Sequence, residues 1–394
     1  MSNKIKELSV RLHGIEIGIL KLINGKMQFQ YNDDIEFPIS LSMTIQSEPF
    51  KEKICRTFFG GFLPENIEIR KILAQKYKIN YTNDFALLKE LGRDCAGAIS
   101  FHYLDDKIVE EQHVFIDGDF LTDDEFKKHI EDLPKIPFIG KRMSLAGAQQ
   151  KTAICLINDK IALPKNNVPT THIVKPMIKN IKESVENEYI CMKSAFELGI
   201  KVANVEIRKI KDLEVLLVER FDRKKSENKE YIKRLPQEDF AQALGVENKY
   251  NVSFKDCLKV LNQTSNPAIN KQDFIKLVIF NFLIGNNDAH AKNFSVFRIF
   301  DDIKLTPAYD LLCTSIYDFD TNFAMKIGKA KTHKEVTKKD WELLAQDLDI
   351  SYKIIESELN RQQNILPNII EKYAKELNSE IGYKILEFVK RNCG

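Results

Sequence analysis

The chain has 394 residues, and at roughly 150 residues per domain this length predicts two or three domains. Hydrophobic residues make up 43% and charged residues 29%, which excludes a disordered, collagen-like or coiled-coil protein. The 59 basic and 57 acidic side chains leave a net charge of +2, so no overall field attracts nucleic acid or an anionic membrane. We expect a globular protein.

The cysteines and the apolar segments favour a cytoplasmic protein. The seven cysteines are scattered and form no Cys-x-x-Cys pair, which argues against a disulfide framework and a zinc site. The N-terminus alternates charged and apolar residues, unlike an export signal. The most apolar window, residues 274–284, is interrupted by Lys276 and Asn281 and is too short to span a membrane. We therefore predict no membrane partner.

The first hundred residues predict a small β-rich sheet followed by helices. Asn24 and Gly25 lie between two apolar runs and are typical of a hairpin turn in which both residues need positive φ. The predicted strands are residues 8–12, 15–23 and 27–31.

Helical periodicity covers residues 65–91, with Asp84 as the predicted N-cap of its second half. Thr122 and Glu125 have capping-box spacing at the start of another helix. The stretch 134–140 contains two prolines and a glycine and indicates a domain boundary.

The rest of the chain predicts an α+β lobe followed by a helical lobe. Strand-like runs and one helix at residues 184–198 alternate up to residue 220, whereas the periodicity after residue 236 is almost entirely helical. The acids that follow Pro236 are expected to open a helix. The fold class is therefore α+β, with residues 1–136 as an α/β accessory domain, 137–222 as an α+β lobe and 223–394 as an α-helical lobe.

A polar cluster follows the apolar helix at residues 274–284. Asp288 and Asn293 are five residues apart, the spacing with which protein kinases place a catalytic carboxylate and a Mg²⁺-binding amide on one loop. A predicted strand at residues 294–300 and then Asp310 follow, in the order of a kinase metal-binding aspartate. Alternatively, the loop is an ordinary Asn- and Asp-rich turn, and Asp310 caps a helix.

Upstream, Lys175 ends an apolar β run and could neutralise nucleotide phosphates. Its partner on the next helix is either Glu186 or Glu188. In isolation Lys175 could equally be an exposed strand-end lysine.

Two further segments have the composition of a nucleotide site. Backbone groups near Glu219 could bind the edge of an adenine, and Phe221 could pack on its face, although Phe221 could also be core. The small-residue loop from Ser144 to Lys151 could bring backbone N–H groups close to phosphates.

Taken together, these segments resemble the HipA family of bacterial serine/threonine protein kinase toxins. The resemblance rests on short sequence motifs at residues 144–151, 172–175, 186–189, 218–223, 235–239, 283–295 and 305–311. Two further motifs lie in the N-terminal region, at residues 60–65 and 91–98.

The resemblance implies a protein-kinase-like, two-lobed fold and a function for each candidate residue. Asp288 would be the catalytic carboxylate, and Asn293 and Asp310 would hold Mg²⁺. Ser144 would be an autophosphorylation site that switches the kinase off. The residues implied to bind ATP are Lys151, Lys175, Glu219, Phe221 and His290.

The resemblance also implies partners. These are a small helix-turn-helix antitoxin of the HipB type, DNA reached only through that antitoxin, and a translation-related protein substrate such as an aminoacyl-tRNA synthetase. Two other functions remain open: a small-molecule kinase, and a corepressor in which catalysis is dispensable. The basic stretch at residues 326–339 could touch DNA in such a complex, or it could be a solvated charged face.

Overall fold

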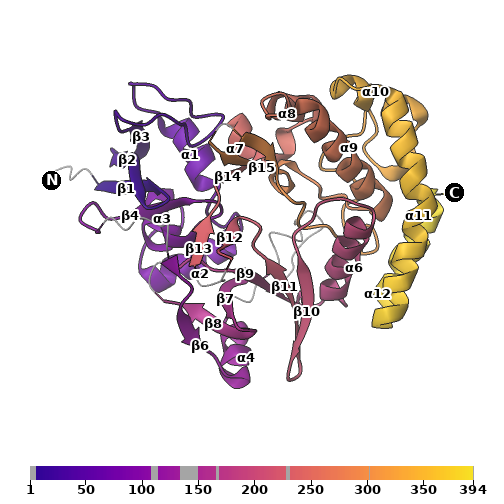
Figure 1. Ribbon diagram of the computed structural model, residues 1–394, viewed down its shortest axis with the longest axis horizontal. Helices are drawn as coiled ribbons and strands as arrows, with labels where there is room; N and C mark the ends of the chain where they lie inside the picture. The colour runs from indigo at the N-terminus through magenta and orange to yellow at the C-terminus, as the bar shows by residue number, and fades with distance from the viewer. Residues whose placement is uncertain are drawn as a thin grey trace.

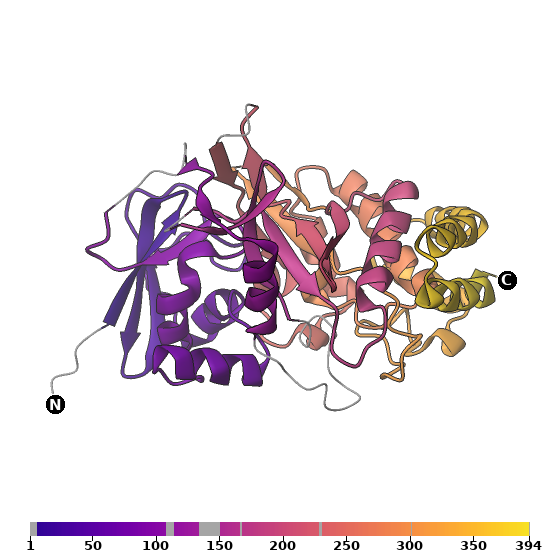
Figure 2. The same cartoon turned by 90° about the horizontal axis from the view of Figure 1, so that it is seen from below.

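The computed structural model describes residues 6–107, 114–133, 150–165, 168–227, 231–300 and 302–393. The chain runs from an N-terminal sheet at one end of the molecule, through a central sheet, to a group of helices at the other end (Figure 1). The same order is seen from below, where α11 and α12 lie farthest from the N-terminal strands (Figure 2). The α+β prediction is confirmed.

The N-terminal sheet is antiparallel in the order β3-β2-β1-β4. The hairpin turn is confirmed, because Asn24 and Gly25 have φ values of 52° and 77°. Buried aromatic side chains from the sheet and from α1 form its core, among them Phe29, Phe59 and Phe101. The elements are β1 (Lys6–Leu12), β2 (Ile15–Ile23), β3 (Lys26–Tyr31), α1 (Glu52–Gly60), α2 (Ile67–Tyr77), α3 (Asp84–Leu91) and β4 (Ile99–His102).

The predicted N-cap of α3 was wrong by one residue. The side chain of Asn83, not of Asp84, accepts the hydrogen bond from the backbone N–H of Ala86. Asp84 is instead the first residue of the helix, where it pairs with Arg70 at 2.5 Å. A carboxylate in the first helical turn is also favoured by the helix dipole, so the sequence signal was real but one position off.

The central sheet has six strands in the order β10-β11-β9-β7-β8-β6. Alternating residues of β11 face its two sides. Val215 and Leu217 pack with Phe126 of α4, while Leu216 and Val218 pack with the helical core on the side of α6. The elements are β6 (Gly118–Phe120), α4 (Asp123–Glu131), β7 (Thr152–Ile157), β8 (Lys160–Pro164), β9 (His172–Pro176), α6 (Ser184–Glu197), β10 (Val205–Ile210) and β11 (Leu213–Glu219).

Residues 114–133 pack against strands that lie beyond the expected boundary. The capping box of α4 is confirmed, with Thr122 and Glu125 bonded reciprocally. β6 pairs with β8, and β5 (Val114–Phe115) pairs with β13 (Tyr231–Arg234). The division between residues 136 and 137 stays a prediction, and residues 134–149 lie outside the described part of the chain.

The C-terminal half is mainly helical, as predicted, and one large core joins its helices to α6. Residues 237–239 differ from the expected helix start, because they form β14, which pairs with β15. Asp239 then caps α7. No described helix is long and apolar enough to cross a membrane. The elements are β12 (Arg223–Lys225), β14 (Gln237–Asp239), α7 (Phe240–Leu244), α8 (Phe254–Leu261), α9 (Pro267–Ile284), β15 (Ser295–Ile299), β16 (Asp302–Leu305), α10 (Lys338–Asp347), α11 (Tyr352–Leu377) and α12 (Glu380–Cys393).

Candidate active site

A buried lysine joins the central sheet to the helical lobe. Lys175 extends from β9, and its Nζ lies 2.6 Å from Glu188 Oε1 on α6 and 2.6 Å from Asp310 Oδ1. Asp310 has a φ of 60°, a left-handed conformation that a short polar residue tolerates at a sharp change of chain direction. The sequence had left the partner of Lys175 open, and the structure identifies it as Glu188. Glu186 instead meets Glu214, and burial together with their hydrogen bond raises the pKa of Glu186 to about 7.

The charges around Asp310 keep it ionised. Burial alone would raise the pKa of this carboxyl, but Lys175 and Lys151 outweigh burial and lower it to about 2. In the same way, burial would lower the pKa of Lys175, whereas Asp310 and Glu188 raise it. At neutral pH Lys175 is therefore a fixed cation beside an ionised Asp310. Burial raises the pKa of Glu188, and Lys175 opposes that rise.

Asn293 contacts the carboxylate oxygen of Asp310 that Lys175 does not. Its Nδ2 donates to Asp310 Oδ2 at 3.3 Å, and its Oδ1 accepts from the backbone N–H of His290 at 3.1 Å. An amide oxygen and an ionised carboxylate are ligands that Mg²⁺ accepts, and rotation of the amide would turn its oxygen towards Asp310. The described residues contain no group of three or more His, Cys, Asp or Glu side chains that could hold a metal. By its donor atoms, the pair of an amide oxygen and an ionised carboxylate fits a Mg²⁺ ion whose other ligands are water and phosphate.

His290 is buried and neutral beside this pair. Burial lowers its pKa to about 3, and neither ring nitrogen has a hydrogen-bond partner within the described part of the chain. Buried polar atoms are nearly always paired, so two unpaired ring nitrogens in a cleft wall indicate a place for a polar ligand.

These residues line one cleft of about 630 Å³ between the sheet and the helical lobe. Phe221 lies in its wall and stacks on Tyr309 with ring centroids 5.5 Å apart. All the predicted cofactor and metal residues that the structure describes border this cleft: Lys151, Lys175, Glu219, Phe221, His290, Asn293 and Asp310. Ser144 lies outside the described residues.

Some backbone groups at the expected adenine position are already used. The N–H of Glu219 donates to Asn204 O at 2.8 Å, and the N–H of Arg220 donates to Thr171 O at 2.9 Å. A base in this part of the cleft must therefore bind other backbone groups of residues 218–221.

The N-terminal region supplies one wall of the cleft, which the sequence reasoning missed. Glu65 reaches Lys249 at 2.8 Å and Lys292 at 2.7 Å, and residues 61–66 line the cleft. The only sequence signal for this wall was the N-terminal motif at residues 60–65, which matched the family but suggested no catalytic or binding role for Glu65.

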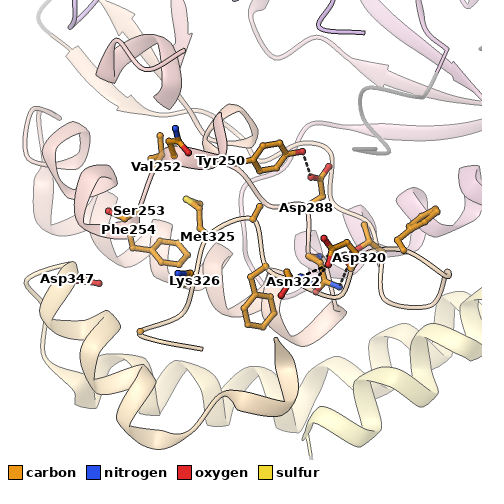
Figure 3. A pocket seen from close by; sticks show the side chains of 17 residues that line it. Tyr250, Val252, Ser253, Phe254, Asp288, Asp320, Asn322, Met325, Lys326 and Asp347 are labelled. Carbon is orange, nitrogen blue, oxygen red and sulfur yellow. Dashed lines mark hydrogen bonds between the residues drawn. The ribbon is translucent and has the colours of Figure 1, made fainter. Parts of the chain in front are cut away.

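Asp288 lines a second cavity of about 720 Å³ (Figure 3). Helix α9 ends at Ile284, and its C-cap Gly285, with a φ of 76°, turns the chain into the loop that carries Asp288. The Tyr250 hydroxyl donates to Asp288 Oδ1 at 3.1 Å, a contact that the sequence did not predict. Asp288 and Asn293 thus belong to one loop, but Asn293 borders the cleft and Asp288 borders the second cavity.

The comparisons with known proteins agree with this geometry. The family model described as the HipA-like C-terminal domain matches residues 143–381, and the one described as the HipA N-terminal domain matches residues 8–102. The chain is 37% identical over 379 residues to the Y4mE protein of Sinorhizobium fredii, covering 90% of this chain and 87% of that protein. It is 33% identical over 313 residues to the serine/threonine-protein kinase toxin HipA of Shewanella oneidensis, covering 74% of this chain and 70% of that protein.

The chain belongs to the HipA family of kinases. A solved complex of Shewanella oneidensis HipA with HipB and operator DNA contains a chain that matches this HipA-family fold with a TM-score of 0.86. That match has 27% sequence identity and covers 98% of this chain and 95% of the solved one. The resemblance to the HipA family that was inferred from the sequence motifs is therefore confirmed.

Proposed function

We propose that this chain is an ATP- and Mg²⁺-dependent serine/threonine protein kinase that acts as the toxin of a toxin-antitoxin pair. The observation that carries the proposal is the position of Lys175, held between Glu188 and Asp310 at 2.6 Å each, with Asn293 bonded to the same aspartate. Phosphoryl transfer depends on positioning and on charge neutralisation, and this arrangement supplies both.

Each residue then has a task. Lys175, Lys151 and His290 would bind the nucleotide phosphates, and Glu219 and Phe221 would lie at the adenine. Mg²⁺, held by Asn293 and Asp310, would neutralise charge on the β- and γ-phosphates. Asp288 would orient the acceptor hydroxyl and accept its proton.

The partners follow from the family. The solved relative is a complex of HipA, HipB and operator DNA. We infer for this chain a helix-turn-helix antitoxin of the HipB type, contact with DNA only through that antitoxin, and a translation-related protein substrate such as an aminoacyl-tRNA synthetase. The proposed location is the cytoplasm.

The test uses purified protein, Mg²⁺, γ-labelled ATP and a host lysate. The wild type is expected to label itself and at least one protein, whereas Asp288→Asn should label none and still bind nucleotide, because the change keeps shape and removes the proton acceptor. Undiminished labelling by Asp288→Asn would refute the assignment.

In cells, expression of the wild type should arrest growth, whereas expression of Asp310→Ala should not. Co-expression of the antitoxin should relieve the arrest.

Ser144 is the proposed off switch. A phosphate there would add about −1.5 to −2 charge to a loop that we propose binds the nucleotide, so it should weaken ATP binding. Homogeneously Ser144-phosphorylated and unmodified protein are compared in one ATP titration, and equal affinities would remove the switch.

A further inference from the structure

The cavity that borders Asp288 is separate from the cleft that we assign to the nucleotide. Its volume is about 720 Å³, and its walls come from the segment before α8 and the long loop between β16 and α10 (Figure 3). Asp288 is the one candidate catalytic residue among the described residues that line it. A second partner of the reaction would therefore approach Asp288 from this side.

A hydroxyl group already occupies the position next to Asp288. Tyr250 lines the cavity, and its hydroxyl donates to Asp288 Oδ1 at 3.1 Å (Figure 3). This is the contact that the hydroxyl of a phosphoryl acceptor has to make with a catalytic carboxylate. The Tyr250 hydroxyl therefore marks where an acceptor hydroxyl would lie.

A buried polar atom in the wall of the cavity also has no partner. Asn287 is only 6% exposed, and its Oδ1 has no hydrogen bond within the described part of the chain. The rest of this residue is well bonded: its N–H donates to Thr314 Oγ1 at 2.8 Å, and its carbonyl accepts from Ala324 N at 2.7 Å. Asn287 thus ties the long loop to the loop of Asp288 and keeps one acceptor unused, which a donor such as a peptide N–H could fill after a small adjustment.

The lining combines apolar surface with negative charge. Phe254 and Met325 are part of the apolar wall (Figure 3). The charged side chains among the described lining residues are Asp288, Asp320, Asp347 and Lys326. A lysine or arginine side chain has the matching shape and charge, because its aliphatic stem packs on apolar surface while its cationic end meets a carboxylate.

We propose that this cavity binds the polypeptide acceptor and selects a lysine or arginine close to the phosphorylated serine or threonine. The inference rests on the proposed kinase function. In the transfer, the acceptor hydroxyl displaces the Tyr250 hydroxyl and gives its proton to Asp288. A bond forms between the acceptor oxygen and the γ-phosphorus, the bond from the γ-phosphorus to the β,γ-bridging oxygen breaks, and ADP leaves.

Asp320 is the residue to test, and the same loop provides a matched control. Asp320 Oδ1 accepts from Asn322 N at 3.0 Å and from Asn322 Nδ2 at 2.6 Å, and an asparagine at this position keeps that acceptor while removing the charge. Asp318 lies two residues away, is exposed and does not line the cavity. Asp318→Asn therefore makes the same change of net charge outside the site.

The experiment is phosphorylation of a positional-scanning peptide library with a central Ser or Thr, using γ-labelled ATP and Mg²⁺. For the wild type, pools with Arg or Lys fixed at one or more flanking positions should incorporate at least about tenfold more label than pools with Asp or Glu. Asp320→Asn should reduce that ratio to below about threefold, whereas Asp318→Asn should leave it unchanged. A nucleotide titration of both variants checks that the cleft remains intact.

Three results would overturn the inference. They are equal labelling of basic and acidic pools, a preference that Asp320→Asn retains, and no labelling of any pool by a protein that labels itself, which would point to an acceptor other than a flexible polypeptide. Failure of the proposed function itself looks different, because the protein would then label neither itself, nor lysate proteins, nor any peptide.

Discussion

Glu65 of the N-terminal region forms a 2.7 Å ion pair with Lys292, which lies on the loop of Asp288 and directly before Asn293. The same carboxylate binds Lys249, next to Tyr250, at 2.8 Å. Burial would raise the pKa of Glu65, but the two lysines outweigh burial and lower it to about 2. The N-terminal region therefore contributes a fixed negative charge to the edge of the cleft that we assign to the nucleotide.

A change of Glu65 to glutamine should tighten nucleotide binding. The carboxylate repels a triphosphate and competes with it for the two lysines, and the amide does neither. Because Glu65 is partly exposed, we expect a modest gain of about 1 kcal/mol, or roughly fivefold in the dissociation constant of an ATP analogue. Calorimetric titration measures this.

The control for Glu65 is Glu68→Gln. Glu68 is exposed, and among the described residues its ion pair is with Lys71 on the same helix. Loss of its charge should therefore not alter nucleotide affinity. Weaker binding by Glu65→Gln would mean that the ion pairs position Lys292 for the nucleotide instead of competing with it.

Replacement of Lys175 by methionine should cost both stability and phosphoryl transfer. The change leaves Glu188 and Asp310 buried without their shared cation, and breaking a buried pair costs about 3 to 5 kcal/mol. Urea unfolding measures the loss of stability, and transfer should fall by at least about a hundredfold in conditions where the variant is folded.

Lys182→Met is the matched surface change. Lys182 pairs with Glu380, and both side chains are more than half exposed, so its loss should change the free energy of unfolding by less than about 1 kcal/mol. A Lys175→Met protein as stable as the Lys182→Met protein would contradict the role assigned to the buried pair.

Local signals explain which parts of the fold could be predicted. The turn at Asn24 and Gly25 and the capping box at Thr122 depend on residues within a few positions of each other, and both are confirmed. The order of Asp288, Asn293 and Asp310 is also readable along the chain, although only the fold shows that Asn293 and Asp310 meet.

Long-range packing explains the rest. Periodicity could not choose between Glu186 and Glu188, because both lie on one helix and only the sheet decides which of them faces Lys175. Glu65 and Tyr250 were missed because their partners are distant in sequence and neither belongs to a catalytic pattern. Residues 237–239 became a strand because β15 supplies a pairing edge, which overrides local propensity.

The stability of the protein should fall in mild acid, in part because of His172. Burial, with a smaller contribution from Lys225, lowers the pKa of His172 from 6.5 to about 4. Between these values the unfolded chain binds a proton that the folded chain does not, so the free energy of unfolding falls as the pH falls through 6.5 and stops falling below about 4.

His172→Gln removes this contribution. Between pH 7.5 and 5.5 the wild type should lose about 1 kcal/mol more than the variant in urea unfolding. An equal loss in both proteins would show that His172 is not neutral in the folded state.

Tyr250→Phe distinguishes two roles for the Tyr250 hydroxyl that donates to Asp288. If this hydroxyl holds the place of the acceptor, as inferred above, its removal takes the tyrosine's hydrogen bond away from Asp288 Oδ1 without moving the ring, which contacts His290 edge-on with centroids 5.5 Å apart. The acceptor then no longer has to break a hydrogen bond to a carboxylate, a contact worth about 1 kcal/mol or more. We expect the KM for the best library peptide to fall about threefold to tenfold, with kcat not reduced and ATP affinity unchanged.

The control is Tyr383→Phe, a change at an exposed tyrosine of α12. If Tyr250 instead positions the carboxylate, kcat will fall while KM stays the same, and steady-state kinetics on these three proteins distinguishes the two results.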